Sequence, residues 1–100
     1  MDKKRLEQII NNENVILFGY TSNCGTCKLA EQMLDIVTHT VDNVQVIKIN
    51  LAISSSIVEH YKIKSTPSFI LLKNNELFDE FYAFHSVTFL YKKINNLLEK

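Results

Sequence analysis

The stretch VILFGYTSNCGTC, residues 15–27, decides the fold of this 100-residue chain. Residues 15–20 are apolar on both sides of the strand pleat, which is typical of a central strand covered on both faces. The only two cysteines, Cys24 and Cys27, follow at once. Apolar residues then recur at the spacing of a helix with one buried face, at Ala30, Met33, Leu34 and Val37. The sequence therefore predicts a strand, a Cys-X-X-Cys motif and a helix in direct succession.

Composition and charge exclude several classes of protein. The length suits one domain over residues 1–100 with a single core. The chain has 11 basic and 11 acidic residues, so its net charge gives no general attraction to nucleic acid or acidic membranes. No apolar run approaches the roughly 20 residues of a membrane span, and the N-terminus lacks the apolar segment of a signal peptide. We therefore expect a cytoplasmic protein, where a cysteine pair usually serves catalysis or metal binding.

Hydrophobic periodicity and capping residues predict the other elements. Strands are expected at residues 15–20, 44–51, 68–72 and 77–82, with Asn74-Asn75 as the turn between the last two. Asp2 and Ser86 are expected to cap the first and last helices. Ser54-Ser55-Ser56 offers N-caps for a short helix between them, and Ser56 with Glu59 has the spacing of a capping box. The order α-β-α-β-α-β-β-α predicts an α/β fold, in which helices cover both faces of a mixed four-stranded sheet.

The cysteine spacing predicts thiol–disulfide chemistry. Residues at i and i+3 in the first turn of a helix lie on one side, so Cys24 and Cys27 can close a small disulfide ring. Helix N–H groups and the helix dipole lower the pKa of Cys24, which makes it the attacking sulfur. Cys27, one turn deeper, then displaces the captured substrate. Gly25 is expected to allow a tight turn with no side chain in the way.

Two other interpretations of the cysteine pair stay open. The pair could be half of a zinc site, but the remaining candidate ligands, His39, His60 and His85, lack finger-like spacing with it. The pair could also be two inert buried thiols, although a position at a helix start argues against this.

Several sequence features together carry a resemblance to a known family. They are the strand VILFGY, the CGTC motif at a helix start, the passage from Val46–Asn50 to Tyr61–Ile63, the dipeptide Thr66-Pro67 before SFILL, and the hairpin Lys73–Glu76. A Cys-X-X-Cys motif followed about 40 residues later by a proline in this element order is a specific combination. Over nearly its whole length the chain resembles the thioredoxin family, which implies the thioredoxin fold and disulfide exchange without a bound cofactor or metal.

The resemblance also implies which residues contact substrate. Asn23, Gly25 and Thr26 form the rim around the attacking sulfur, and the Thr66 main chain pairs with the substrate as an added strand. It further implies a cis Thr66-Pro67 bond, whereas the plainer interpretation of Pro67 is a strand start. Ala83 corresponds to a small residue that lets substrate approach, and ordinary packing explains it nearly as well. His85 could shuttle protons, but a surface histidine is the preferred interpretation.

Three departures from the common family pattern stand out. Asn23 replaces the usual tryptophan and Thr26 the usual proline of WCGPC, so the rim is smaller and more polar. Phe18 stands where the family carries a buried aspartate, and Lys48, that aspartate's usual partner, is expected to lack its mate. Cys27 would then lack a nearby base, which predicts slow resolution of the mixed disulfide.

The resemblance implies a thiol–disulfide oxidoreductase that reduces protein disulfides. Its electron donor would be an NADPH-dependent thioredoxin reductase or a low-molecular-weight thiol. The alternative is a thioredoxin-fold binding or adaptor module with incidental redox activity, which the atypical Asn23 and Thr26 keep open. A glutathione-dependent enzyme would need a glutathione pocket, and the sequence identifies none.

The departures predict a less reducing Cys24/Cys27 couple than that of thioredoxin. Without the buried carboxylate and the motif proline, we expect a potential between about −270 mV and the glutaredoxin range near −200 mV. Equilibration of the purified protein against dithiothreitol or glutathione measures it. A potential at or below that of thioredoxin would contradict the prediction.

Overall fold

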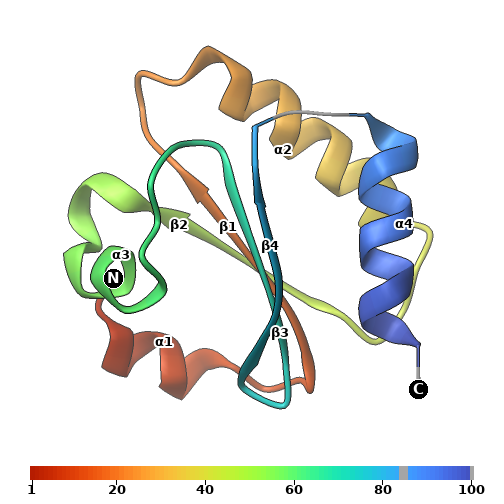
Figure 1. Ribbon diagram of the computed structural model, residues 1–100, viewed down its shortest axis with the longest axis horizontal. Helices are drawn as coiled ribbons and strands as arrows, with labels where there is room; N and C mark the ends of the chain where they lie inside the picture. Colours follow the sequence, from red (N-terminus) through yellow and green to blue (C-terminus); the bar gives the residue numbers. More distant parts are fainter. Residues whose placement is uncertain (84–85, 100) are drawn as a thin grey trace.

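The computed structural model describes residues 1–83 and 86–99, and these form a sheet between two pairs of helices (Figure 1). The helices are α1 (Lys3–Ile9), α2 (Gly25–Thr38), α3 (Ser55–Tyr61) and α4 (Val87–Leu98), with a 3₁₀ turn at Leu51–Ile53. The strands are β1 (Asn14–Tyr20), β2 (Gln45–Asn50), β3 (Ser68–Lys73) and β4 (Glu76–Tyr82). This order confirms the expected one. In the described ranges no helix is long and apolar enough to cross a membrane.

The four strands form one mixed sheet in the order β2-β1-β3-β4. β1 pairs in parallel with β2 and antiparallel with β3, and β3 pairs antiparallel with β4. Asn74 and Asn75 connect β3 to β4 with φ angles of 53° and 67°, the left-handed values that a two-residue hairpin turn requires. The predicted mixed sheet and asparagine turn are therefore confirmed.

Alternation along β1 divides the core into two layers. Ile16 and Phe18 pack with buried residues of α2 and α4, such as Leu34 and Leu90, on one face. Val15, Leu17 and neighbouring apolar residues of β2 and β3 pack with Leu6 of α1 and Ile57 of α3 on the other face. Because both faces are covered, β1 is apolar at every position from Val15 to Phe18, as the middle of a central strand must be. The predicted helices on both faces are confirmed (Figure 1).

Two of the three predicted helix caps are confirmed. Asp2 accepts from the N–H of Arg5, and Ser86 accepts from the N–H of Phe89. The predicted capping box at Ser56 is wrong, because α3 begins two residues earlier than a cap at Ser56 requires, with Ser54 as its N-cap. The Ser56 hydroxyl instead accepts from the N–H of Lys3, at 2.9 Å, and so joins α3 to the start of α1. A hydrogen bond to another helix has thus replaced the capping bond predicted within α3.

The two glycines provide a matched test of packing next to the cysteine motif. A Cβ at Gly19 would lie 2.3 Å from Oγ of Ser68 and 2.9 Å from a methyl of Leu51, whereas a Cβ at Gly25 meets nothing within 4 Å. We expect Gly19→Ala to lower the free energy of unfolding by about 1–3 kcal/mol, because overpacking shifts its buried neighbours. Gly25→Ala should change it by less than about 0.5 kcal/mol.

Denaturant unfolding of both oxidised variants measures the difference. Equal stabilities of Gly19→Ala and Gly25→Ala would show that the close approach of β1 to β3 at Ser68 does not constrain the fold.

Candidate active site

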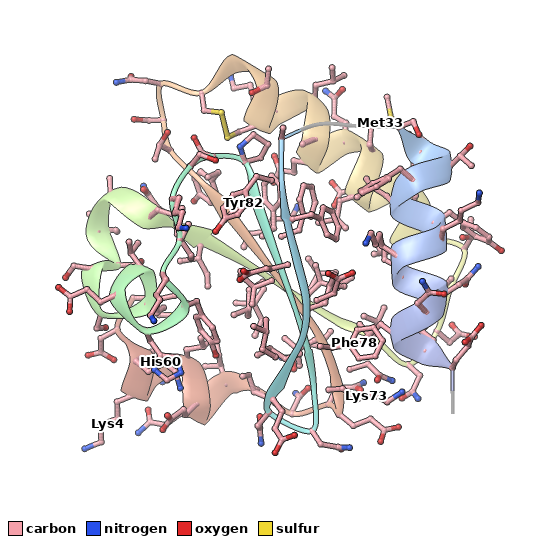
Figure 2. The ribbon with its side chains drawn as sticks, viewed as in Figure 1. Lys4, Met33, His60, Lys73, Phe78 and Tyr82 are labelled. Carbon is pink, nitrogen blue, oxygen red and sulfur yellow. A yellow bond between two sulfur atoms is a disulfide. The ribbon has the colours of Figure 1, made fainter. Side chains whose placement is uncertain are left out.

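The two cysteines lie at the junction between the end of β1 and the start of α2. β1 ends at Tyr20, and Cys24 is the N-cap of α2, with extended φ and ψ of −100° and 101°. Cys24 and Cys27 form a disulfide with a Cα–Cα distance of 5.2 Å, drawn in yellow at the start of α2 in Figure 2. The N–H of Cys27 donates to the carbonyl oxygen of Cys24 at 3.2 Å. The predicted position of the motif and its disulfide ring are confirmed.

The two sulfurs differ in exposure. Cys27 is 3% exposed and belongs to the core layer under α2 and α4, whereas Cys24 is half-buried at the edge of that layer. Both line a cavity of about 440 Å³ whose apolar wall includes Phe18 and Tyr20 of β1. A partner molecule can therefore reach Cys24 more easily than Cys27.

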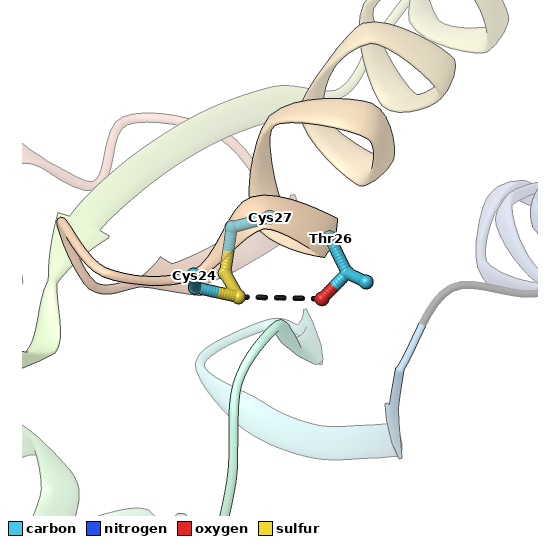
Figure 3. Close-up of a disulfide and its surroundings, with 3 residues drawn as sticks. All are labelled: Cys24, Thr26 and Cys27. Atoms are coloured by element: carbon cyan, nitrogen blue, oxygen red, sulfur yellow. Dashed lines mark hydrogen bonds between the residues drawn. A yellow bond between two sulfur atoms is a disulfide. The ribbon is translucent and has the colours of Figure 1, made fainter.

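The residues of the motif's rim are exposed to solvent. Asn23, Gly25 and Thr26 are all exposed. Gly25 has no positive φ, so its backbone does not need glycine, and the expected tight turn is an ordinary helix start. The missing side chain still leaves open space in front of the sulfurs. Oγ1 of Thr26 lies 3.4 Å from Sγ of Cys24 (Figure 3).

The Thr66-Pro67 peptide bond is cis, as the resemblance implied. The segment that carries it leads into β3 and passes beside the start of α2 (Figures 1 and 3). Thr66 and Thr21, from the loop before the motif, line one small cavity. The N–H of Ala83 donates to the carbonyl oxygen of Pro67 at 3.0 Å, and Ala83 has a positive φ of 66°. The fold thus brings residues from three separate stretches of the sequence toward one edge of the sheet.

Lys48 lacks the family's aspartate, as expected, but it has two other partners. Its Nζ lies 2.9 Å from Oε2 of Glu31 and 3.2 Å from Oδ1 of Asp35, both on α2. Phe18 and Lys48 are opposite each other in the β1–β2 register, so the lysine side chain faces α2. The hydrogen bond that Lys48 donates to Glu31 raises the pKa of Lys48, an effect that desolvation partly offsets and that Asp35 reinforces. The family's buried aspartate is absent, and two helix carboxylates hold the lysine instead.

Comparisons with known proteins agree with this geometry. A family model described as Thioredoxin matches residues 1–96. The chain belongs to the thioredoxin family. It is 38% identical over 85 residues to the "Thioredoxin-like protein YusE" of Bacillus subtilis, covering 85% of this chain and 80% of that protein. It is 32% identical to "Thioredoxin Y1, chloroplastic" of Arabidopsis thaliana, covering 91% of this chain but 54% of that longer protein.

Solved structures show the same fold. A thioredoxin of Plasmodium falciparum superposes with a TM-score of 0.85 at 25% identity, covering 95% of this chain and 93% of that chain. The oxidised mitochondrial thioredoxin 3 of Saccharomyces cerevisiae has a TM-score of 0.85 at 22% identity, over 95% of this chain and 90% of that one. Thioredoxin-family membership and a cysteine pair at disulfide distance identify the chain as a thiol–disulfide oxidoreductase in preference to a binding module.

Glu31 is the site residue that the sequence interpretation missed. It lines the same cavity as both cysteines of this thioredoxin-family chain. The signal was its spacing, because a residue four positions after Cys27 lies on the same face of the helix. The cavity that both cysteines line therefore carries a carboxylate from α2, which is paired with Lys48. The slow resolution expected for Cys27 stays a prediction.

Other candidates contribute less to the site. His85, the imagined proton shuttle, lies outside the described residues, which end at 83 before it and resume at 86. His39 and His60, considered for zinc, are exposed on α2's C-terminal end and on α3. Within the ranges that the structure describes, no group of three or more His, Cys, Asp or Glu side chains could hold a metal ion.

We expect the negative charge of Glu31 to raise the pKa of the thiols that share its cavity. Replacement Glu31→Gln removes a negative charge from the cavity wall, so we expect it to lower the pKa of Cys24 by about 0.3 pH unit in a reduced Cys27→Ser protein. Asp35→Asn is the matched control, because Asp35 also pairs with Lys48 but does not line the cavity. The pH dependence of alkylation measures both. Equal shifts in the two variants would contradict a local effect of Glu31.

Proposed function

We propose that this protein reduces disulfides in protein substrates, with Cys24 as the attacking sulfur and Cys27 as the resolving sulfur. The observation that carries the proposal is the disulfide at the start of α2, which joins a half-buried sulfur to a buried one. A helix start favours the thiolate of Cys24, and burial keeps Cys27 away from external reagents.

The first step uses Cys24 as nucleophile. Its thiolate attacks one sulfur of a substrate disulfide, and a new bond joins Cys24 to that sulfur. The second substrate sulfur leaves as a thiolate and takes a proton from solvent. Because Cys24 is the N-cap and its side chain makes no capping hydrogen bond in the disulfide form, a reduced Cys24 is free to face the N–H groups of the first helical turn.

The second step uses Cys27. Its thiol loses a proton, and its sulfur attacks Sγ of Cys24, so that the bond from Cys24 to the substrate breaks and the substrate leaves reduced. The net reaction transfers two electrons and two protons from the dithiol to the substrate. Glu31 lines the same cavity, and its carboxylate is the one among the lining residues that can take up the released proton.

Substrate contact is proposed for the residues around Cys24. Within the described part of the chain, the Thr66 main chain makes no backbone–backbone hydrogen bond, so it can pair with an extended substrate segment. Pro67 directs the protein segment that contains Thr66 past the motif. Ala83, whose N–H donates to the carbonyl oxygen of Pro67, adds little bulk there. Asn23, Gly25 and Thr26 form an exposed rim without a large side chain, which suits substrates that present a small or polar neighbour to the disulfide.

The dithiol must be regenerated after each turnover. A thioredoxin reductase or a low-molecular-weight thiol supplies the two electrons, and we propose a reducing cytoplasmic compartment for the cycle. No bound cofactor takes part in the exchange itself.

Serine variants separate this function from a binding module. In insulin reduction with dithiothreitol, Cys24→Ser should fall to the uncatalysed rate, because the attacking sulfur is gone. Cys27→Ser should stall as a covalent adduct with the substrate, which mass spectrometry detects. The double variant with both serines is the control for background.

Equal activity of the wild type and Cys24→Ser would contradict the enzymatic proposal. Adducts that form equally with Cys24→Ser and Cys27→Ser would contradict the assignment of the two roles.

A further inference from the structure

The hydroxyl of Thr26 makes a direct contact with the attacking sulfur. Oγ1 of Thr26 lies 3.4 Å from Sγ of Cys24, which is hydrogen-bond distance for sulfur (Figure 3). A disulfide sulfur carries no proton, and neither does a thiolate, so in both forms the hydroxyl must be the donor. Wherever the two atoms are in contact in either of these forms, the hydroxyl of Thr26 donates and the sulfur accepts.

Helix geometry places this hydroxyl where the charge develops. Gly25 is the first helical residue of α2, so Thr26 is the second and Cys24 is the N-cap. Side chains of a helix tilt toward its N-terminus, which aims Thr26 back at Cys24. Thr26 is exposed, and its contact with Sγ is the one side-chain hydrogen bond that it makes within the described residues.

We propose that Thr26 is a catalytic residue of the exchange reaction: its hydroxyl donates to Sγ of Cys24 and stabilises negative charge there whenever Cys24 attacks or leaves. This inference rests on the proposed function, in which Cys24 is the attacking sulfur. A hydrogen bond to a charged acceptor is stronger than one to a neutral acceptor, so the contact favours the thiolate over the protonated thiol.

The hydroxyl acts in two steps of the cycle. When Cys24 attacks a substrate disulfide, the hydrogen bond raises the fraction of thiolate, at some cost in the nucleophilicity of each thiolate. When the oxidised protein is recycled, one thiolate of the donor attacks Sγ of Cys24 and Cys27 leaves as a thiolate, so that a mixed disulfide joins the donor to Cys24. The second thiolate of the donor then attacks the donor sulfur of this mixed disulfide and forms the donor's disulfide. The bond between Cys24 and its partner sulfur then breaks, its electron pair stays on Sγ, and the hydroxyl stabilises this leaving thiolate. The donor dithiol supplies both electrons.

Three titratable side chains share the cavity with Cys24: Tyr20 from β1, and Lys28 and Glu31 from α2. Lys28 favours the thiolate and Glu31 opposes it, both through charge. Such effects weaken as salt screens them. The effect of Thr26 is a direct contact between two atoms, so it should change little with salt.

The test compares Thr26→Val with Thr26→Ser, each in a Cys27→Ser background so that Cys24 is the one remaining thiol. Valine keeps the branched shape but has no hydroxyl, and serine keeps the hydroxyl. We expect the pH of half-maximal iodoacetamide alkylation to rise by about 0.5–1 pH unit in Thr26→Val and by less than about 0.2 pH unit in Thr26→Ser. The rise should be the same at low and high salt.

Two results would overturn the inference: no rise in Thr26→Val, or an equal rise in Thr26→Ser. Thr26→Ala, which also lacks the hydroxyl, repeats the test if the valine variant does not fold. Thermal unfolding shows whether each variant is folded. The Cys27→Ser parent separates this inference from the function on which it rests. A parent thiol with an ordinary pKa near 8.5 contradicts the thiolate mechanism itself, whereas an acidic parent thiol that Thr26→Val leaves unchanged contradicts only the role of Thr26.

Discussion

The start of α2 at Cys24 is the constraint on which the site depends. β1 is fixed in place because it pairs with β2 on one side and β3 on the other and is covered on both faces. α2 is fixed against the same sheet by buried residues such as Ala30 and Leu34. Only three residues, 21–23, separate the end of β1 from Cys24, so the first cysteine is held at the edge of the core and the second, one turn later, falls inside it. The difference in reactivity between two identical side chains follows from that placement.

The polar side chains of this site lie at the edge of the cavity, and its buried wall is apolar. Phe18 closes the floor of the cavity with an apolar ring that is 1% exposed. The carboxylate that lines the cavity with the cysteines comes from Glu31 on α2, and Lys48 of β2 forms an ion pair with it. Both side chains are about 38% exposed, so water and salt moderate their influence. The contact between the Thr26 hydroxyl and Sγ of Cys24 is short-ranged. It therefore becomes more important, relative to these screened charges, for the protonation state of Cys24.

Much of this arrangement could be predicted from the sequence, because its signals are local. The apolar β1, the Asn74-Asn75 turn and the caps at Asp2 and Ser86 each depend on a few adjacent residues. The errors arose where a tertiary contact replaced a local one. Ser56 was predicted to cap its own helix but binds the N–H of Lys3 across the fold, 53 positions away in the chain. The sequence shows that Lys48 lacks its usual aspartate, but no pattern along β2 could reveal that Glu31 and Asp35 of α2 pair with it instead.

The central claim is that the fold makes Cys24 reactive and shields Cys27. The most direct measurement is partial alkylation of the fully reduced protein with a substoichiometric amount of iodoacetamide, below the ordinary thiol pKa of about 8.5, followed by mass-spectrometric mapping. The account predicts that nearly all of the label is on Cys24. Equal labelling of the two cysteines, or preferential labelling of Cys27, would contradict it.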